Sequence, residues 1–189
     1  MKRIVILASG SGTNAENIIK YFKERKNIEV TQVLSNKKDA KVLDRAKRLG
    51  VSYATFNRKN FYTTSEVLNI LELKADYIIL AGFLWKIPAN ILEAFPNKII
   101  NIHPALLPKY GGKGMYGMHV HNAVVENKEK ESGITIHYVN ENYDEGAIIF
   151  QKSFEILVCD TAEDVAAKIH TLEQENFHKV IEKVILENG

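Results

Sequence analysis

The first hundred residues repeat one pattern, in which a short apolar run is followed by a turn and then by an amphipathic stretch. The first run, residues 4–8, is rich in β-branched residues and ends at a glycine-rich turn, which is typical of a strand buried on both faces of a parallel sheet. Apolar residues then recur at helical spacing over residues 14–25. This alternation predicts βαβ units and a doubly wound, mostly parallel α/β sheet.

The other elements follow from the same patterns. Further strands are expected at residues 30–35, 51–56, 77–81 and 98–102, and further helices at residues 40–49, 64–73 and 88–95. Residues 135–139 and 148–157 predict an antiparallel strand pair at the end of the sheet, because a short polar connection joins them. Asp160, with Glu163 three residues later, predicts the start of a long C-terminal helix.

Length and composition narrow the class of protein. A chain of 189 residues fits one domain, residues 1–189. A composition of 46% hydrophobic and 25% charged residues excludes a disordered chain. A formal charge of +2 excludes binding of nucleic acid through a broad basic surface. The longest apolar stretch, residues 77–85, is far shorter than the roughly 20 residues that span a membrane. We therefore expect a soluble, cytoplasmic protein without a membrane partner.

The first candidate site is the run Ser-Gly-Ser-Gly-Thr-Asn at residues 9–14, between the first strand and the first helix. Small residues expose backbone N–H groups here beside the positive end of a helix dipole, and such a turn binds phosphate. With Ala15 the run also fits the loose dinucleotide pattern G-x-G-x-x-A, but Asn36-Lys37-Lys38 replaces the acidic partner of that pattern. An NAD site and a plain structural turn remain as alternatives.

The second candidate is Asn101-Ile102-His103-Pro104, at the carboxyl end of a predicted central strand, where open α/β sheets bind ligands. Alternation places Asn101 and His103 on the same side of that strand. An amide donor beside an imidazole that carries a proton suits a reaction in which negative charge develops on a carbonyl oxygen. A buried pair of satisfied polar side chains is the alternative.

The third candidate is the acidic loop at residues 140–146. It is either a solvated connection or the source of a carboxylate that reaches an imidazole and raises its pKa.

Histidines and the single cysteine offer weaker signals. His103, His119, His121 and His137 lie in the middle third of the chain, and His119 and His121 have the spacing of a metal-binding pair, so a zinc site is a further alternative. Cys159 cannot form an intrachain disulfide and is expected to be a small buried hydrophobe. The glycine-rich stretch at residues 109–118 is expected to be a mobile loop.

Taken together, these segments resemble one family. The run at residues 9–14, Leu-Ala-Gly-Phe at residues 80–83, Asn-Ile-His-Pro-Ala-Leu-Leu-Pro-Lys-Tyr at residues 101–110 and Asp-Glu-Gly at residues 144–146 are similar, in order and spacing, to phosphoribosylglycinamide formyltransferases. The stretch after residue 101 is also shared with methionyl-tRNA formyltransferase and formyltetrahydrofolate hydrolase. The glycine turn, the chain length and the lack of an added tRNA-binding domain favour the first family.

The resemblance implies a Rossmann-like formyltransferase fold. It also implies an enzyme of purine biosynthesis that moves the formyl group of 10-formyltetrahydrofolate, a cosubstrate, to the amine of glycinamide ribonucleotide, without a metal. Asn101, His103 and Asp144 match the catalytic trio of the family. Gly12, Thr13 and Asn14 match its phosphate-binding turn, and Glu173 matches a carboxylate that contacts glycinamide ribonucleotide.

The folate site is also implied by the resemblance. The formyl donor is expected along Leu84, Trp85, Lys86 and Ile87, beside Asn101, with its pterin near Asn140, Glu141, Asn142, Tyr143 and Asp144. Lys59 stands where the family often has arginine, and the loop at residues 111–118 is longer and richer in glycine than usual. The expected partners are small molecules, and a monomer or a homodimer is expected. A hydrolase or tRNA formyltransferase and a regulatory dinucleotide-binding domain remain as competing readings.

Overall fold

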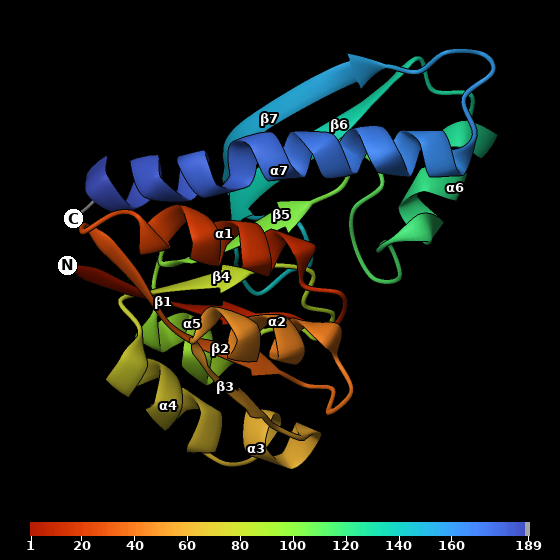
Figure 1. The fold of residues 1–189 in the computed structure, drawn as a ribbon. Helices are drawn as coiled ribbons and strands as arrows, with labels where there is room; N and C mark the ends of the chain where they lie inside the picture. Colours follow the sequence, from red (N-terminus) through yellow and green to blue (C-terminus); the bar gives the residue numbers. More distant parts are fainter. Residues whose placement is uncertain (188–189) are drawn as a thin grey trace.

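The computed structural model describes residues 1–187. These residues form a seven-stranded sheet in the order β3-β2-β1-β4-β5-β6-β7 (Figure 1). Its strands are β1 (Lys2–Leu7), β2 (Ile28–Ser35), β3 (Ser52–Thr55), β4 (Tyr77–Leu80), β5 (Ile99–His103), β6 (Glu131–Tyr138) and β7 (Ile148–Glu155). The neighbouring strands among β1 to β5 pair in parallel, whereas β6 pairs antiparallel with both β5 and β7. This mostly parallel sheet confirms the predicted fold class.

Helices cover both faces of this sheet. They are α1 (Thr13–Lys23), α2 (Lys41–Leu49), α3 (Arg58–Tyr62), α4 (Glu66–Lys74), α5 (Ala89–Ala94), α6 (Met118–Glu126) and α7 (Ala162–Glu187). Ile4 and Ile6 pack with α1, α2 and α7, while Val5 and Leu7 pack with α3, α4 and α5 on the other face. Because successive side chains of a strand point to opposite faces, the continuous apolar run of β1 supplies both cores.

Two short helices differ from the sequence-based expectation. α3 was not predicted, and it begins with Asn57 and Asn60, whose side chains each accept a hydrogen bond from the other residue's backbone N–H. α6 begins at Met118, directly after the glycine-rich loop, and Val120 and Val124 on one of its faces are buried with Ala105. α3 has only five residues, too few to produce a helical period, whereas α6 has nine and was missed because the glycine-rich stretch was extended into its start.

The start of the C-terminal helix also needs correction. Thr161, not Asp160, caps α7, since its Oγ1 accepts a hydrogen bond from the Asp164 N–H while Asp164 accepts one from the Thr161 N–H. Asp160 instead accepts hydrogen bonds from Lys168 and from the Leu157 N–H. Cys159 lies exposed in the preceding turn, so the expected burial of this cysteine was wrong.

The strand order places a switch point beside β1. From β1 the chain moves to β2 and β3 on one side and then returns to β4 on the other. The segments that follow β1 and β4 are in contact, because the Ser9 N–H donates to the Gly82 carbonyl at 3.0 Å and the Ala81 N–H donates to the Leu7 carbonyl at 3.0 Å. Ligands of open α/β sheets bind at such a point.

Replacing the capping threonine tests the corrected start of α7. Thr161→Ala removes the acceptor of the Asp164 N–H and should lower the free energy of unfolding by about 1 kcal/mol. Ser65→Ala is the matched control, because Ser65 occupies the N-cap of α4 without a side-chain capping bond. Urea denaturation measures both variants, and an equal loss in the two would contradict the assignment of the cap.

Candidate active site

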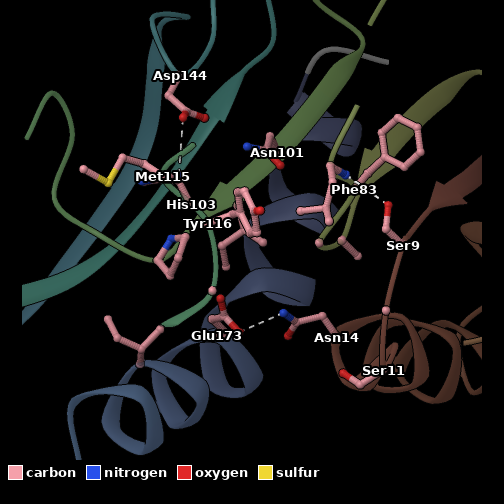
Figure 2. A pocket seen from close by; sticks show the side chains of 18 of the residues that line it. Ser9, Ser11, Asn14, Phe83, Asn101, His103, Met115, Tyr116, Asp144 and Glu173 are labelled. Carbon is pink, nitrogen blue, oxygen red and sulfur yellow. Dashed lines mark hydrogen bonds and ion pairs between the residues drawn. The ribbon is translucent and has the colours of Figure 1, made fainter. Parts of the chain in front are cut away.

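A cleft of about 790 Å³ opens at the carboxyl ends of β1, β4 and β5 (Figure 2). Segments far apart in the sequence line it, including the glycine turn, the end of β5, the glycine-rich loop and the middle of α7. The lining residues are 9–14, Lys37, 81–84, 101–104, 112–117, His121, Tyr143, Asp144, Ala166, Ile169, His170 and Glu173. The cleft therefore brings together all three candidate segments found in the sequence.

The glycine turn is held in place by α2. Gly12 has φ +74°, and a Cβ at this position would lie 2.5 Å from the Cβ of Val42, so no side chain fits. The Gly10 carbonyl accepts the Val42 N–H at 3.2 Å, and the Ser11 carbonyl accepts Nε of Arg45 at 2.7 Å. These contacts occupy the carbonyl groups of the turn. The first N–H groups of α1, which have no partner within the helix, remain for a ligand in the cleft.

Ser9 joins this turn to the segment after β4. Its hydroxyl donates to Oδ1 of Asn36 at 2.7 Å and accepts the N–H of Leu84 at 3.0 Å. Ser9 is only 2% exposed, so both bonds are shielded from water.

The side chain of Asn14 makes two hydrogen bonds to α7. Its Nδ2 donates to Oε2 of Glu173 at 2.9 Å (Figure 2). Its Oδ1 accepts Nε2 of Gln174 at 2.7 Å. The side chain thus connects α1 to α7 and orients Glu173 at the wall of the cleft. The backbone N–H of Asn14 and the second N–H of its amide are left for a ligand.

Asn101 is oriented by His137, to which the sequence analysis gave no role. In the antiparallel register of β5 and β6 the two residues are partners, and Nδ2 of Asn101 lies 3.1 Å from Nε2 of His137. Nδ1 of His137 lies 2.9 Å from the Tyr138 carbonyl, which can only accept, so Nδ1 carries the proton and Nε2 accepts from Asn101. Because an unprotonated ring nitrogen needs a donor, the amide end of Asn101 that faces His137 must be its nitrogen. One of the two N–H groups of this nitrogen is used by the bond, and the other is left.

His103 is 3% exposed and has a polar partner on each ring nitrogen. Nε2 donates to the Tyr110 carbonyl at 2.7 Å, and Nδ1 lies 3.6 Å from Oδ2 of Asp144. Burial lowers the pKa of the imidazole below 6.5, although the Asp144 charge and the Tyr110 carbonyl act in the opposite direction. The expectation that the carboxylate keeps His103 charged was therefore wrong for the free protein, because desolvation outweighs the ion pair.

Asp144 is held as a carboxylate in the cleft. Its Oδ2 accepts the Gly112 N–H at 2.9 Å, and its Oδ1 lies 3.6 Å from Nε2 of His137. Burial acts to raise the pKa of this carboxyl group, but its contacts with His137, His103 and the Gly112 N–H outweigh burial and hold the pKa below its ordinary value. The acidic loop thus supplies the carboxylate that the sequence suggested.

The residues expected to bind folate are only partly at the cleft. Leu84, Tyr143 and Asp144 line it together with Asn101, whereas the rest of the expected set does not. Those outside are Lys59, Trp85, Lys86, Ile87, Asn140, Glu141 and Asn142.

Packing explains why several of these side chains point elsewhere. Ile87 is 3% exposed in the core beneath α4 and α5, and Trp85 packs among Phe56, Phe61 and Phe83. The guanidinium of Arg58, the neighbour of Lys59, lies 5.1 Å from the centre of the Trp85 ring.

Other lining residues had no role in the sequence analysis. Lys37 lies exposed beside the glycine turn, and Lys113 and Tyr116 project from the glycine-rich loop. In the sequence, Asn36 and Lys37 after β2 served only to show that the acidic residue of a dinucleotide site is absent. Their position at the end of a central strand was the available signal.

The alternative of a zinc site at His119 and His121 finds no support in the fold. His119 and His121 lie in α6, and residues two apart on a helix do not face each other. His121 is buried at the cleft, whereas the ring of His119 packs edge-on against Tyr116. Within residues 1–187 no cluster of three or more His, Cys, Asp or Glu is arranged to hold a metal ion. The same residues contain no helix with the length and apolar character needed to span a bilayer.

Known proteins resemble the chain over nearly its whole length. A phosphoribosylglycinamide formyltransferase of Haemophilus influenzae is 37% identical, covering 96% of this chain and 86% of its own length. The enzyme of that name from Bacillus subtilis is 35% identical, with 98% and 95% covered. Two chloroplastic enzymes of the same name are also similar, from Arabidopsis thaliana and Vigna unguiculata, and the chain spans 64% and 60% of their lengths.

A solved structure has the same fold. The phosphoribosylglycinamide formyltransferase of Bacillus halodurans superposes with a TM-score of 0.88 at 33% identity, covering 100% of this chain and 97% of that one. The family model described as formyl transferase matches residues 2–181. The chain therefore belongs to the formyl transferase family.

Proposed function

We propose that this protein is a phosphoribosylglycinamide formyltransferase, which transfers the formyl group of 10-formyltetrahydrofolate to the amine of glycinamide ribonucleotide. One observation carries the proposal above all. The cleft joins a helix start suited to phosphate with an amide, an imidazole and a carboxylate, contributed by Asn101, His103 and Asp144. The names of the related proteins support the same substrates.

The phosphate of glycinamide ribonucleotide would bind at the glycine turn. The backbone N–H groups of Gly12, Thr13 and Asn14 and the dipole of α1 favour an anion there, and the ammonium group of Lys37 adds positive charge. Glu173, held by Asn14, would contact the rest of this substrate. With the phosphate at the turn, the amine would then lie toward the end of β5, which lines the same cleft.

The formyl donor would enter from the side of Leu84 and Tyr143. We assign its pterin to the space beside Asp144, and its more distant part to the surface near Trp85, Lys86 and Lys59. Ile87 and the residues at 140–142 would support this site through the backbone. Arg58 is placed on the Trp85 ring and adds a cation to that surface.

The chemistry follows from the protonation states in the cleft. The neutral amine attacks the formyl carbon, a C–N bond forms, and an electron pair moves to the formyl oxygen, where an N–H of Asn101 donates to it. Nδ1 of neutral His103 takes the proton of the attacking nitrogen, directly or through a water molecule held by Asp144. The bond from carbon to N10 of the folate then breaks, and N10 receives the proton from His103. No covalent intermediate with the protein is needed.

A direct assay tests the reaction. Mixing the protein with glycinamide ribonucleotide and 10-formyltetrahydrofolate should release tetrahydrofolate, followed by absorbance, only when both substrates are present. Formate release with water alone would instead indicate a hydrolase. Saturable binding of NAD without any binding of folate would favour the dinucleotide reading.

Replacing Asn101 tests the oxyanion contact. Asn101→Ala should lower kcat on the order of a hundredfold to a thousandfold, because one preorganised donor to the developing oxyanion is lost. Asn69→Ala, at an exposed position on α4, serves as the control for a loss of the same side chain. A kcat within twofold of the unsubstituted protein would refute the role of Asn101.

The protonation state of His103 is measurable by an NMR titration of its ring. Burial lowers its pKa, so the imidazole should become charged only as the pH falls below 6.5. Asp144→Asn removes a negative charge that favours the charged ring, so the pKa should fall further in this variant. A midpoint above 6.5 in the unsubstituted protein would contradict the proposed proton transfer.

A further inference from the structure

The segment that leaves β5 returns to the cleft and touches two of the proposed catalytic side chains through its backbone. The Tyr110 carbonyl accepts Nε2 of His103 at 2.7 Å, and two residues later the Gly112 N–H donates to Oδ2 of Asp144 at 2.9 Å. A carbonyl oxygen can only accept, so this contact requires the proton of the neutral imidazole to be on Nε2. Nδ1 is then the ring nitrogen that is free to exchange a proton.

The position of this carbonyl depends on an uncommon backbone conformation. Tyr110 has φ +55°, in the left-handed region that costs a residue with a side chain roughly 1 kcal/mol. The following residue is closely enclosed, because a Cβ at Gly111 would lie 2.7 Å from Cδ2 of Leu107 and 3.2 Å from the Cβ of Asp144. A different conformation at Tyr110 would move the carbonyl away from His103.

The Tyr110 side chain is anchored outside the cleft. Its hydroxyl donates to Oε1 of Glu129 at 2.9 Å, and the same carboxylate accepts Nζ of Lys109 at 3.0 and 3.1 Å. Glu129 lies in the connection between α6 and β6 and does not line the cleft. The anchor therefore fixes Tyr110 from the side opposite to His103 without touching a substrate.

We propose that Tyr110, anchored by Glu129, is a positioning residue that keeps the proton of His103 on Nε2 and reserves Nδ1 for the reaction. The inference deepens the proposed function and rests on it for the role of His103. Without the anchor, the strained backbone at Tyr110 relaxes and the imidazole samples the other tautomer, whose Nδ1 is already protonated and cannot take the proton of the amine.

The test reads the tautomer directly. The full-length protein, labelled with ¹⁵N in its histidines, should show His103 above its pKa as the Nε2–H tautomer alone. Tyr110→Phe keeps the ring but removes the bond to Glu129, and it should give a mixture of both tautomers and lower kcat on the order of two- to tenfold, the effect of one hydrogen bond. KM for glycinamide ribonucleotide should stay within twofold, since Tyr110 contacts no substrate.

Three further variants complete the design. Glu129→Ala removes the same anchor without altering Tyr110 and should reproduce both effects, which keeps the test valid if Tyr110→Phe folds poorly. Glu129→Gln retains an acceptor oxygen and should restore most of the Nε2–H tautomer. Tyr21→Phe is the matched control, because the Tyr21 hydroxyl donates to Glu182 at 2.6 Å between α1 and α7, away from the cleft.

The outcomes separate this inference from the proposed function. An unchanged Nε2–H tautomer in both Tyr110→Phe and Glu129→Ala would overturn the positioning role, whatever the activity. An equal change in Tyr21→Phe would also overturn it, because the effect would then reflect general stability. A shifted tautomer in a protein that transfers no formyl group would support the positioning role while refuting the proposed function.

Discussion

The parallel pairing of β1 with β4 determines where each part of the cleft lies. Because the carboxyl ends of these neighbouring strands meet, the turn after β1 and the segment after β4 share backbone hydrogen bonds, and β5 lies next along the same edge. The continuous apolar run of β1 makes this arrangement possible, since it is buried on both faces. A phosphate site and a reaction centre thereby become neighbours although about ninety residues separate them in the sequence.

Desolvation and charge compete within the cleft. His103 and Asp144 lie 3.6 Å apart, close enough for an ion pair if the imidazole is protonated, yet burial lowers the pKa of the imidazole and the carboxyl group remains the charged member. Such a pair is suited to proton transfer, because a buried neutral imidazole can accept a proton while the nearby carboxylate favours the imidazolium that forms.

Much of this arrangement could be predicted from the sequence. The apolar runs of the central strands and the composition of the glycine turn are local signals that the sequence shows directly. Alternation along one strand was sufficient to place Asn101 and His103 on the same side. The capping of α7 was placed one residue too early, because Asp160 and Thr161 are both good capping residues and only their hydrogen bonds in the folded chain distinguish them.

The missed features depend on contacts between distant residues. His137 acquires its role from the register of β5 against β6, and the Asn14 side chain from Glu173 of α7, 159 residues away in the sequence. The pKa of His103 was predicted in the wrong direction because burial arises from the whole fold, whereas Asp144 was visible as a nearby charge. The short helix α3 gave no period, and the side chains of Trp85 and Ile87 were directed into packing that the sequence alone does not reveal.

The hydroxyl of Ser9 has a consequence for the dimensions of the cleft. It binds the segments that follow β2 and β4 at the same time, and both bonds lie beneath the surface. The glycine turn and the backbone at Leu84 are consequently parts of one wall, which spans two strand spacings of about 4.8 Å each, because β1 lies between β2 and β4. The sheet thus sets the dimensions of this wall, whereas the glycine-rich loop at residues 112–117 lines the same cleft without belonging to a helix or strand.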